Sequence, residues 1–139
     1  MDGYFFEDLS LGQSASFAKT ITEADILLFA AVSGDTNPVH INAEAAAASI
    51  FKERIAHGML SASLISTVLG TKLPGAGTIY LGQSLKFKAP VKIGQTVTAT
   101  LVVTALDPAR KRATLSTTCI VEGKTVIEGE ATVMVQSRS

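Results

Sequence analysis

The chain has 139 residues, a length that favours one domain spanning residues 1–139 with its own core. Hydrophobic residues make up 47% of it and charged residues 17%, which excludes a disordered chain. The 12 basic and 12 acidic residues cancel and form no basic stripe, so we expect no nucleic-acid partner. So low a charged fraction also predicts that apolar surface is covered in an oligomer.

The cysteine content and the apolar runs bear on the compartment. The single cysteine, Cys119, excludes a disulfide within the chain and a cysteine-based metal site, which fits a reducing compartment. The first residues carry Glu7 and Asp8 and lack the basic-then-apolar order of a signal peptide. The longest uncharged run, 58–71, is too short and too rich in serine and glycine to span a bilayer. We therefore expect a cytoplasmic protein without a membrane partner.

The first elements are a strand and a capped helix. Residues 14–21 alternate loosely and predict a strand. Thr22 then supplies a helix N-cap, and Asp25 completes a variant capping box in which Asp replaces Glu. Gly34 follows at the place where a left-handed C-cap is needed, so the helix should end just before residue 35.

A proline shapes the next segment. Pro38 cannot continue a helix and biases Asn37 towards an extended conformation. We therefore expect Asp35, Asn37 and His40 to lie on one restrained loop. Asn42 is the expected N-cap of a short alanine-rich helix.

The middle of the chain changes character twice. Residues 51–54 are polar, and we expect solvent to cover them. Residues 57–70 have helical length, no charge, and small or apolar residues around the whole circumference, which is typical of a buried helix.

From residue 79 the hydrophobic period is two, which indicates strands joined by short turns. One face of the first of these strands should carry Ile79, Leu81, Leu85, Phe87 and Ala89. Turns at 107–110 and 122–124 separate the later strands. An antiparallel sheet and one uncharged helix pack well when the sheet wraps the helix, so we expect an α+β fold.

Asp35 and His40 are the candidates for chemistry. Taken singly, an Asp after a helix end is an ordinary turn residue, and a lone His is more often structural. Together on a proline-braced loop they offer a carboxylate and an imidazole within reach of one water, which suits general acid–base chemistry near neutral pH. Two histidines without clustered acids or thiols do not favour a metal site.

The start of the uncharged helix is a second candidate. Gly58 leaves N–H groups unpaired at the positive end of the helix dipole, a suitable place for a carbonyl oxygen that gains negative charge. The residues alone favour a simpler role in close packing, and His57 is expected to stabilise the loop before the helix. Ser61, Ser63 and Ser66 can bond backward to carbonyls one turn earlier. No Gly-x-Ser-x-Gly elbow supports a serine hydrolase.

These residues together resemble a known family, the MaoC-like, (R)-specific enoyl-CoA hydratases. The likeness lies in residues 35–40, which read Asp-Thr-Asn-Pro-Val-His, and in the His-Gly-Met-Leu of residues 57–60. It continues through residues 80–91 and 129–131, and is similar to the short single-domain hydratases that feed polyhydroxyalkanoate synthesis. The resemblance implies a hot-dog fold with an additional helical segment carrying the hydratase motif. It also implies a homodimer whose sheets join edge to edge.

The resemblance also implies a reaction, the reversible syn addition of water to trans-2-enoyl-CoA that gives the (R)-3-hydroxyacyl thioester. Asp35 and His40 would hold and activate the water, and the N–H of Gly58 would polarise the thioester carbonyl. No metal or redox cofactor is implied, because coenzyme A arrives with the acyl-CoA substrate. The substrate-binding residues carried over are Asn37, Ser66 and Leu69.

The chain departs from the family pattern at one position, and rival activities stay open. Many members carry Asp two residues after the catalytic His, where Asn42 removes a negative charge. A hot-dog acyl-CoA thioesterase would release free thiol, and a non-catalytic acyl-thioester binding module would bind without turnover. A 3-hydroxyacyl-ACP dehydratase would use the same residues in reverse. Lys52 and Arg54 could contact coenzyme A phosphates, although solvated surface is the expected role.

Overall fold

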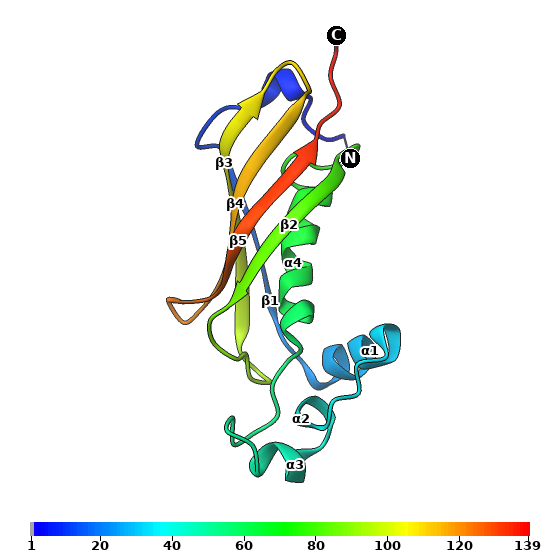
Figure 1. Cartoon of the computed structure of the whole chain (residues 1–139), viewed down its shortest axis with the longest axis vertical. Coiled ribbons are helices and arrows are strands. Elements are labelled where there is room, and N and C mark those ends of the chain that lie inside the picture. The colour runs from blue at the N-terminus through cyan, green and yellow to red at the C-terminus, as the bar shows by residue number, and fades with distance from the viewer. Residues whose placement is uncertain (1) are drawn as a thin grey trace.

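The computed structural model describes residues 2–139, so Met1 of the expected domain 1–139 lies outside the described residues. A five-stranded sheet curls around one long helix, and shorter helices gather at one end, away from both termini (Figure 1). This is the α+β, hot-dog arrangement predicted from the sequence, and the prediction is confirmed. None of the helices in residues 2–139 combines the length and apolar character needed to cross a membrane.

The sheet is antiparallel throughout, with the order β1-β3-β4-β5-β2. Its strands are β1 Ser14–Thr20, β2 Ile79–Phe87, β3 Thr96–Asp107, β4 Arg112–Val121 and β5 Lys124–Met134. Buried and partly exposed residues alternate along β3 and β4, as their period of two predicts. Cys119 of β4 is buried, and burial raises the pKa of its thiol to about 11.

The long helix α4 (Gly58–Thr71) lies in the concave face of the sheet, against β1, β3 and β4. Ile65 and Val68 are fully buried in the core. The prediction that this helix is buried around its whole circumference is wrong for the single chain, because five strands cover only one side of it. We call the uncovered side the open face of α4, and its exposed residues are Met59, Ser63, Ser66 and Gly70.

The face predicted for β2 is wrong at the start of the strand. The register with β5 skips one residue between Tyr80 and Gly82, which leaves Leu81 in a bulge. The extra residue shifts the alternation, so Tyr80 rather than Ile79 shares a face with Leu85. Hydrophobic periodicity cannot reveal such a shift, because both candidate faces carry apolar residues.

Helix α1 (Glu23–Ser33) has the ends that the sequence predicts. Thr22 and Asp25 form the expected capping box: the Thr22 hydroxyl accepts from the Asp25 N–H, and the Asp25 carboxylate accepts from the Thr22 N–H. Gly34 ends the helix with φ +78°, in the left-handed region that favours glycine.

The predicted loop through residue 40 is wrong in part, because Pro38 begins a short helix, α2 (Pro38–Ile41). Proline is well tolerated at the first helical position, where its missing N–H would have no intrahelical acceptor. Asn37 caps this helix by accepting a hydrogen bond from the N–H of Val39 at 3.2 Å. Asn42 caps α3 (Ala43–Ala47), as predicted.

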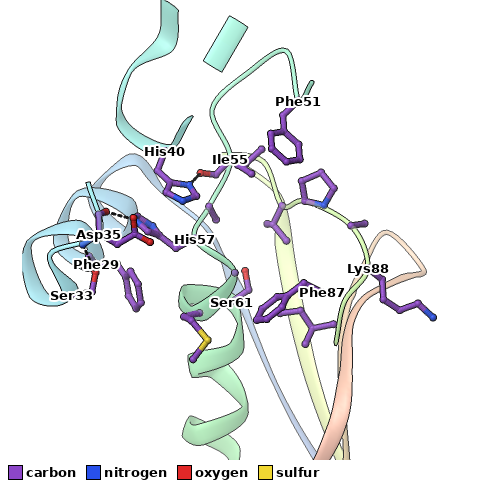
Figure 2. Close-up of a pocket in the computed structure, with 17 residues that line it drawn as sticks. Phe29, Ser33, Asp35, His40, Phe51, Ile55, His57, Ser61, Phe87 and Lys88 are labelled. Atoms are coloured by element: carbon purple, nitrogen blue, oxygen red, sulfur yellow. Dashed lines mark hydrogen bonds between the residues drawn. The ribbon is translucent and has the colours of Figure 1, made fainter. Parts of the chain in front are cut away.

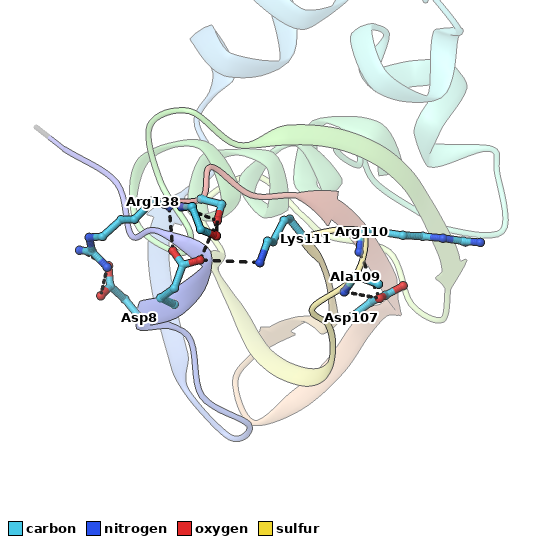
Figure 3. A network of polar contacts seen from close by, with 9 residues as sticks. Asp8, Asp107, Ala109, Arg110, Lys111 and Arg138 are labelled. Carbon is cyan, nitrogen blue, oxygen red and sulfur yellow. Dashed lines mark hydrogen bonds and ion pairs between the residues drawn. The ribbon is translucent and has the colours of Figure 1, made fainter.

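The other end of the sheet is closed by the two terminal segments (Figure 3). The short helix η1 (Phe6–Asp8) contributes Glu7 and Asp8 to a polar network with the C-terminal residues. The Glu7 carboxylate accepts from Ser137 Oγ at 2.6 Å and from the Arg138 N–H at 2.9 Å. Asp8 accepts two hydrogen bonds from the Arg138 guanidinium, at 2.8 and 3.0 Å.

Candidate active site

A cavity of about 600 Å³ lies where the short helices meet the start of α4 and the end of β2 (Figure 2). Most of its wall is apolar, with Phe29 and Phe87 on opposite sides. The polar residues of its lining include Ser33, Asp35, His40, His57, Ser61 and Lys88. Asp35, His40 and Gly58, the three residues expected to carry the reaction, therefore lie on one cavity.

His40 lies in α2 and is only 8% exposed. Its Nδ1 is 2.8 Å from the backbone oxygen of Ile55. A carbonyl oxygen can only accept, so Nδ1 carries the proton, and Nε2 of the neutral ring keeps a lone pair. This one bond fixes the tautomer that a general base requires.

Asp35 lies between α1 and α2, and three hydrogen bonds fix its position. Its N–H donates to Ser33 Oγ at 3.1 Å. Its backbone oxygen accepts from Nε2 of His57 at 2.9 Å. Its carboxylate accepts from the N–H of Asn37 at 3.2 Å, an Asx turn that orients the side chain. The residue as a whole is exposed.

Asp35, His40 and His57 form one tight group, in which one side-chain ligand atom of each lies within 4.8 Å of the others. The two imidazole rings stack with centroids 3.9 Å apart and an interplanar angle of 28°. An imidazole binds a metal in its ring plane, at about 2.0–2.1 Å for zinc. Two nearly parallel rings at this spacing share no in-plane point at such distances, so the geometry does not fit a common metal ion.

His57 is the N-cap residue of α4 and is 2% exposed. Its Nε2–H donates to the Asp35 carbonyl, so its Nδ1 is an acceptor in the neutral ring. That Nδ1 is buried and has no hydrogen-bond partner among residues 2–139. The expected loop-stabilising role of His57 agrees with this contact, and the ring also supports His40 by stacking.

Gly58 begins α4, where N–H groups have no intrahelical acceptor. A Cβ at this position would lie 2.7 Å from Cε1 of Phe87, so the glycine leaves room for that ring. The two roles considered from the sequence, close packing and an available N–H donor, are therefore compatible.

Arg54 is a site residue that the sequence did not reveal, and the prediction that it is solvated is wrong. Its side chain is 16% exposed. Nε donates to the backbone oxygen of His40 at 2.6 Å, and Nη1 donates to Glu23 at 2.6 Å. The partners lie 14 and 31 residues earlier in the chain, so no local pattern could indicate them.

Of the remaining predicted residues, Asn37 contacts Asp35 of the Asp35–His40 pair, here called the dyad, whereas Ser66 and Leu69 do not line its cavity. Asn37 caps α2, and Leu69 is 1% exposed in the core. Ser66 lines a second cavity of about 590 Å³ between the open face of α4 and β2. Phe29 and Met59 line both cavities, so the two adjoin along α4.

Comparison with known proteins places the chain in a family. It matches the MaoC like domain over residues 9–130. It is 65% identical to an (R)-specific enoyl-CoA hydratase of Rhodospirillum rubrum, over 97% of this chain and 94% of that protein. Its structure is similar to the unliganded R-hydratase PhaJ1 from Pseudomonas aeruginosa (TM-score 0.93, 47% identity, 98% of this chain and 88% of that one). The (R)-hydratase from A. caviae involved in PHA biosynthesis is also similar (TM-score 0.90, 46% identity, 93% and 98%). The chain therefore belongs to the MaoC-like domain family, as its resemblance in residues 35–40 and 57–60 predicts.

Proposed function

We propose that this protein adds water to trans-2-enoyl-CoA and forms (R)-3-hydroxyacyl-CoA. One observation carries the proposal: His40, whose Nε2 is left free by the bond of Nδ1 to Ile55, and the Asp35 carboxylate line one largely apolar cavity, with a ring nitrogen within 4.8 Å of a carboxylate oxygen. The similarity to the (R)-specific enoyl-CoA hydratase of Rhodospirillum rubrum supports the same reaction.

Asp35 and His40 can perform this addition without another acid or base. A water held between Asp35 and His40 attacks C3 of the enoyl group, and one of its protons passes to the dyad as the new C–O bond forms. The electrons of the double bond move towards the thioester oxygen and return when C2 takes a proton from the dyad. One water is added in total, and both side chains recover their starting protonation.

The start of α4 assists when charge moves onto the substrate. In the enolate-like state the thioester oxygen carries negative charge, and the N–H of Gly58 is a donor at the positive end of the helix. The Phe87 ring packs beside Gly58.

We further propose that the reaction uses no metal and no redox cofactor. Hydration requires only proton transfers, and coenzyme A enters as part of the substrate. The stacking of His40 on His57 supports this proposal, because it separates the ring planes in which a shared metal would have to lie.

The proposed assembly is a homodimer, joined edge to edge through β2. Within residues 2–139 that strand pairs with β5 alone, and its exposed side chains include Ile79, Leu81 and Phe87. A second sheet on this edge would also cover the adjoining open face of α4. We place the dimer in the cytoplasm, where its product could supply polyhydroxyalkanoate synthesis.

Steady-state assays with trans-2-enoyl thioesters from crotonyl-CoA to dodecenoyl-CoA test the proposal. We expect loss of the enoyl absorbance, no release of free thiol, and an (R)-3-hydroxyacyl product on chiral analysis. Thiol release from saturated acyl-CoA would instead indicate a thioesterase. Binding without turnover would indicate an acyl-thioester binding module, and preference for acyl-carrier-protein substrates would indicate the dehydratase.

A further inference from the structure

Ser61 differs from the other hydroxyl residues of α4 in being buried, whereas they are exposed or partly exposed. Its side chain is buried, at 1% exposure, and its Oγ has no hydrogen-bond partner among residues 2–139. Ser63, Thr67 and Thr71 on the same helix each donate to a carbonyl three or four residues earlier. The expectation that Ser61 also bonds backward is wrong.

The unpaired hydroxyl of Ser61 belongs to the cavity that holds the dyad. Buried polar groups in folded proteins nearly always have a partner, because leaving one unpaired lowers stability. An unpaired hydroxyl on the wall of a cavity is therefore available to a molecule that enters it.

The direction of the side chain relates Ser61 to Gly58. Helical side chains lean towards the N-terminus and cover the preceding turn, so residue 61 covers the turn that begins at residue 58. Figure 2 shows the Ser61 hydroxyl at the top of α4, between His57 and Phe87 and directed towards the cavity. Both candidate donors thus lie at one end of the helix.

Nη2 of Arg54 is also buried and unpaired, but Arg54 does not line this cavity. The other unpaired group on the cavity wall, in His57, cannot play the same part as Ser61. The free Nδ1 of His57 accepts hydrogen bonds in the neutral ring and offers no proton to a carbonyl oxygen. A serine hydroxyl can donate. Of these two unpaired buried groups, Ser61 alone is suited to an oxygen that becomes negative.

We propose that the Ser61 hydroxyl is a second hydrogen-bond donor to the thioester carbonyl oxygen of the substrate, beside the N–H of Gly58. The inference rests on the proposed hydratase function. The bond strengthens as the enolate-like state forms, so Ser61 is a catalytic residue that acts on kcat more than on KM.

Substitution separates this role from packing. We expect Ser61→Ala to lower kcat by about tenfold to a hundredfold. Its melting temperature should equal or exceed that of the wild type, because a buried unpaired hydroxyl is removed. Ser61→Cys keeps the volume but has a weaker donor, so its kcat should lie between those of the wild type and Ser61→Ala.

Thr71→Ala is the control: it removes a hydroxyl at the far end of α4 and should keep the wild-type kcat. A Ser61→Ala kcat within twofold of the wild type, or a wild-type kcat in Ser61→Cys, would overturn the proposal.

A spectroscopic measurement tests the bond itself. With Asp35→Asn to stop turnover, the carbonyl stretch of bound crotonyl-CoA should lie below that of the free thioester. Adding Ser61→Ala should move the stretch part of the way back to that of the free thioester. If the double variant has the same stretch as Asp35→Asn alone, the inference is overturned. If the wild type does not hydrate crotonyl-CoA at all, the proposed function fails first. Hydration by the wild type with no effect of Ser61 would refute only this inference.

Discussion

The two ends of the sheet differ in how their polar groups are paired. At the end closed by the termini, Glu7, Asp8 and Arg138 are bonded to one another or to neighbouring backbone while still facing solvent (Figure 3). Four buried side-chain atoms in residues 2–139 have no hydrogen-bond partner. Three of them, Nη2 of Arg54, Nδ1 of His57 and Oγ of Ser61, lie at the end closed by the short helices (Figure 2 shows His57 and Ser61), and the fourth, Oγ1 of Thr78, lies directly before β2. Paired polar groups at the first end tie the termini together. Unpaired buried groups at the second end lower stability and leave donors and acceptors for a ligand.

This difference in pairing indicates where chemistry can take place in this fold. A side chain whose hydrogen bonds are all made within the protein is not available to a substrate. His40 combines both states, because its Nδ1 is bonded to Ile55 while its Nε2 stays free. The substitutions below therefore should affect activity at one end and only stability at the other.

The largest effect is expected at His40. His40→Asn can keep a donor near the Ile55 oxygen but has no nitrogen that takes a proton, and His40→Gln lacks such a base as well. We expect kcat for crotonyl-CoA hydration to fall by about 10²- to 10⁴-fold in both variants. Circular dichroism should show the wild-type fold. A folded variant with more than a tenth of the wild-type kcat would refute the role of His40 as a base.

Arg54 should have the next largest effect, as a positioning residue. Arg54→Met removes the bonds to His40 and Glu23, so we expect kcat to fall by about ten- to a hundredfold, with KM changing less. Unfolding by denaturant should show a loss of about 1–3 kcal/mol. Arg54→Lys should recover part of the rate.

Lys92→Met is the matched control for Arg54. It removes an exposed ion pair with Glu53, at 3.4 Å, at the residue that forms an isolated β-bridge with Ile55. Exposed pairs contribute little, so rate and stability should remain close to the wild type. Equal effects of the Arg54 and Lys92 substitutions would show that Arg54 has no special relation to His40.

Gly58 should give a smaller effect that a second substitution can reverse. In Gly58→Ala the new methyl group meets the Phe87 ring at 2.7 Å, which displaces either the ring or the helix start. We expect kcat/KM to fall by about tenfold. Phe87→Leu in the same chain should restore part of it. Without any recovery, the Gly58 effect would have to come from something other than this contact.

The smallest effect on activity is expected at the opposite end, where Glu7→Gln should leave the rate unchanged. Hydrogen bonds from Arg138 and Ser137 hold the pKa of Glu7 at about 2, below its ordinary value of 4.5. A lowered pKa means that the ionised form stabilises the fold above pH 4.5 and that this contribution disappears as the pH falls towards 2. The melting temperatures of the wild type and Glu7→Gln should therefore converge between pH 5 and about 2.5. A constant difference over that range would contradict the proposed coupling.

The sequence predicted the parts of this molecule that depend on local patterns. The capping box at Thr22, the left-handed Gly34 and the alternation along β4 are each determined by neighbouring residues. The loop predicted at Pro38 is instead the start of α2, because a proline can begin a helix as well as end one. The bulge at Leu81 left no sign in the pattern of hydrophobic residues.

The sequence predicted the reactive residues of the candidate site but not the contacts that hold them in position. Asp35 and His40 stood out by type and spacing, and the family resemblance added the role of Gly58. The bond from Arg54 to His40 and the stacking of His57 on His40 depend on how distant segments meet in three dimensions. The unpaired hydroxyl of Ser61 is a property of packing, which no spacing rule encodes.

The most direct test of the central claim is the hydration of trans-2-enoyl-CoA by the wild type and by Asp35→Asn, with chiral analysis of the product. Asp35 is exposed, so the substitution by Asn should leave the melting temperature unchanged. We predict an (R)-3-hydroxyacyl product from the wild type and a kcat about 10²- to 10⁴-fold lower for the variant. An (S) product, or a folded Asp35→Asn protein with the wild-type rate, would contradict the account.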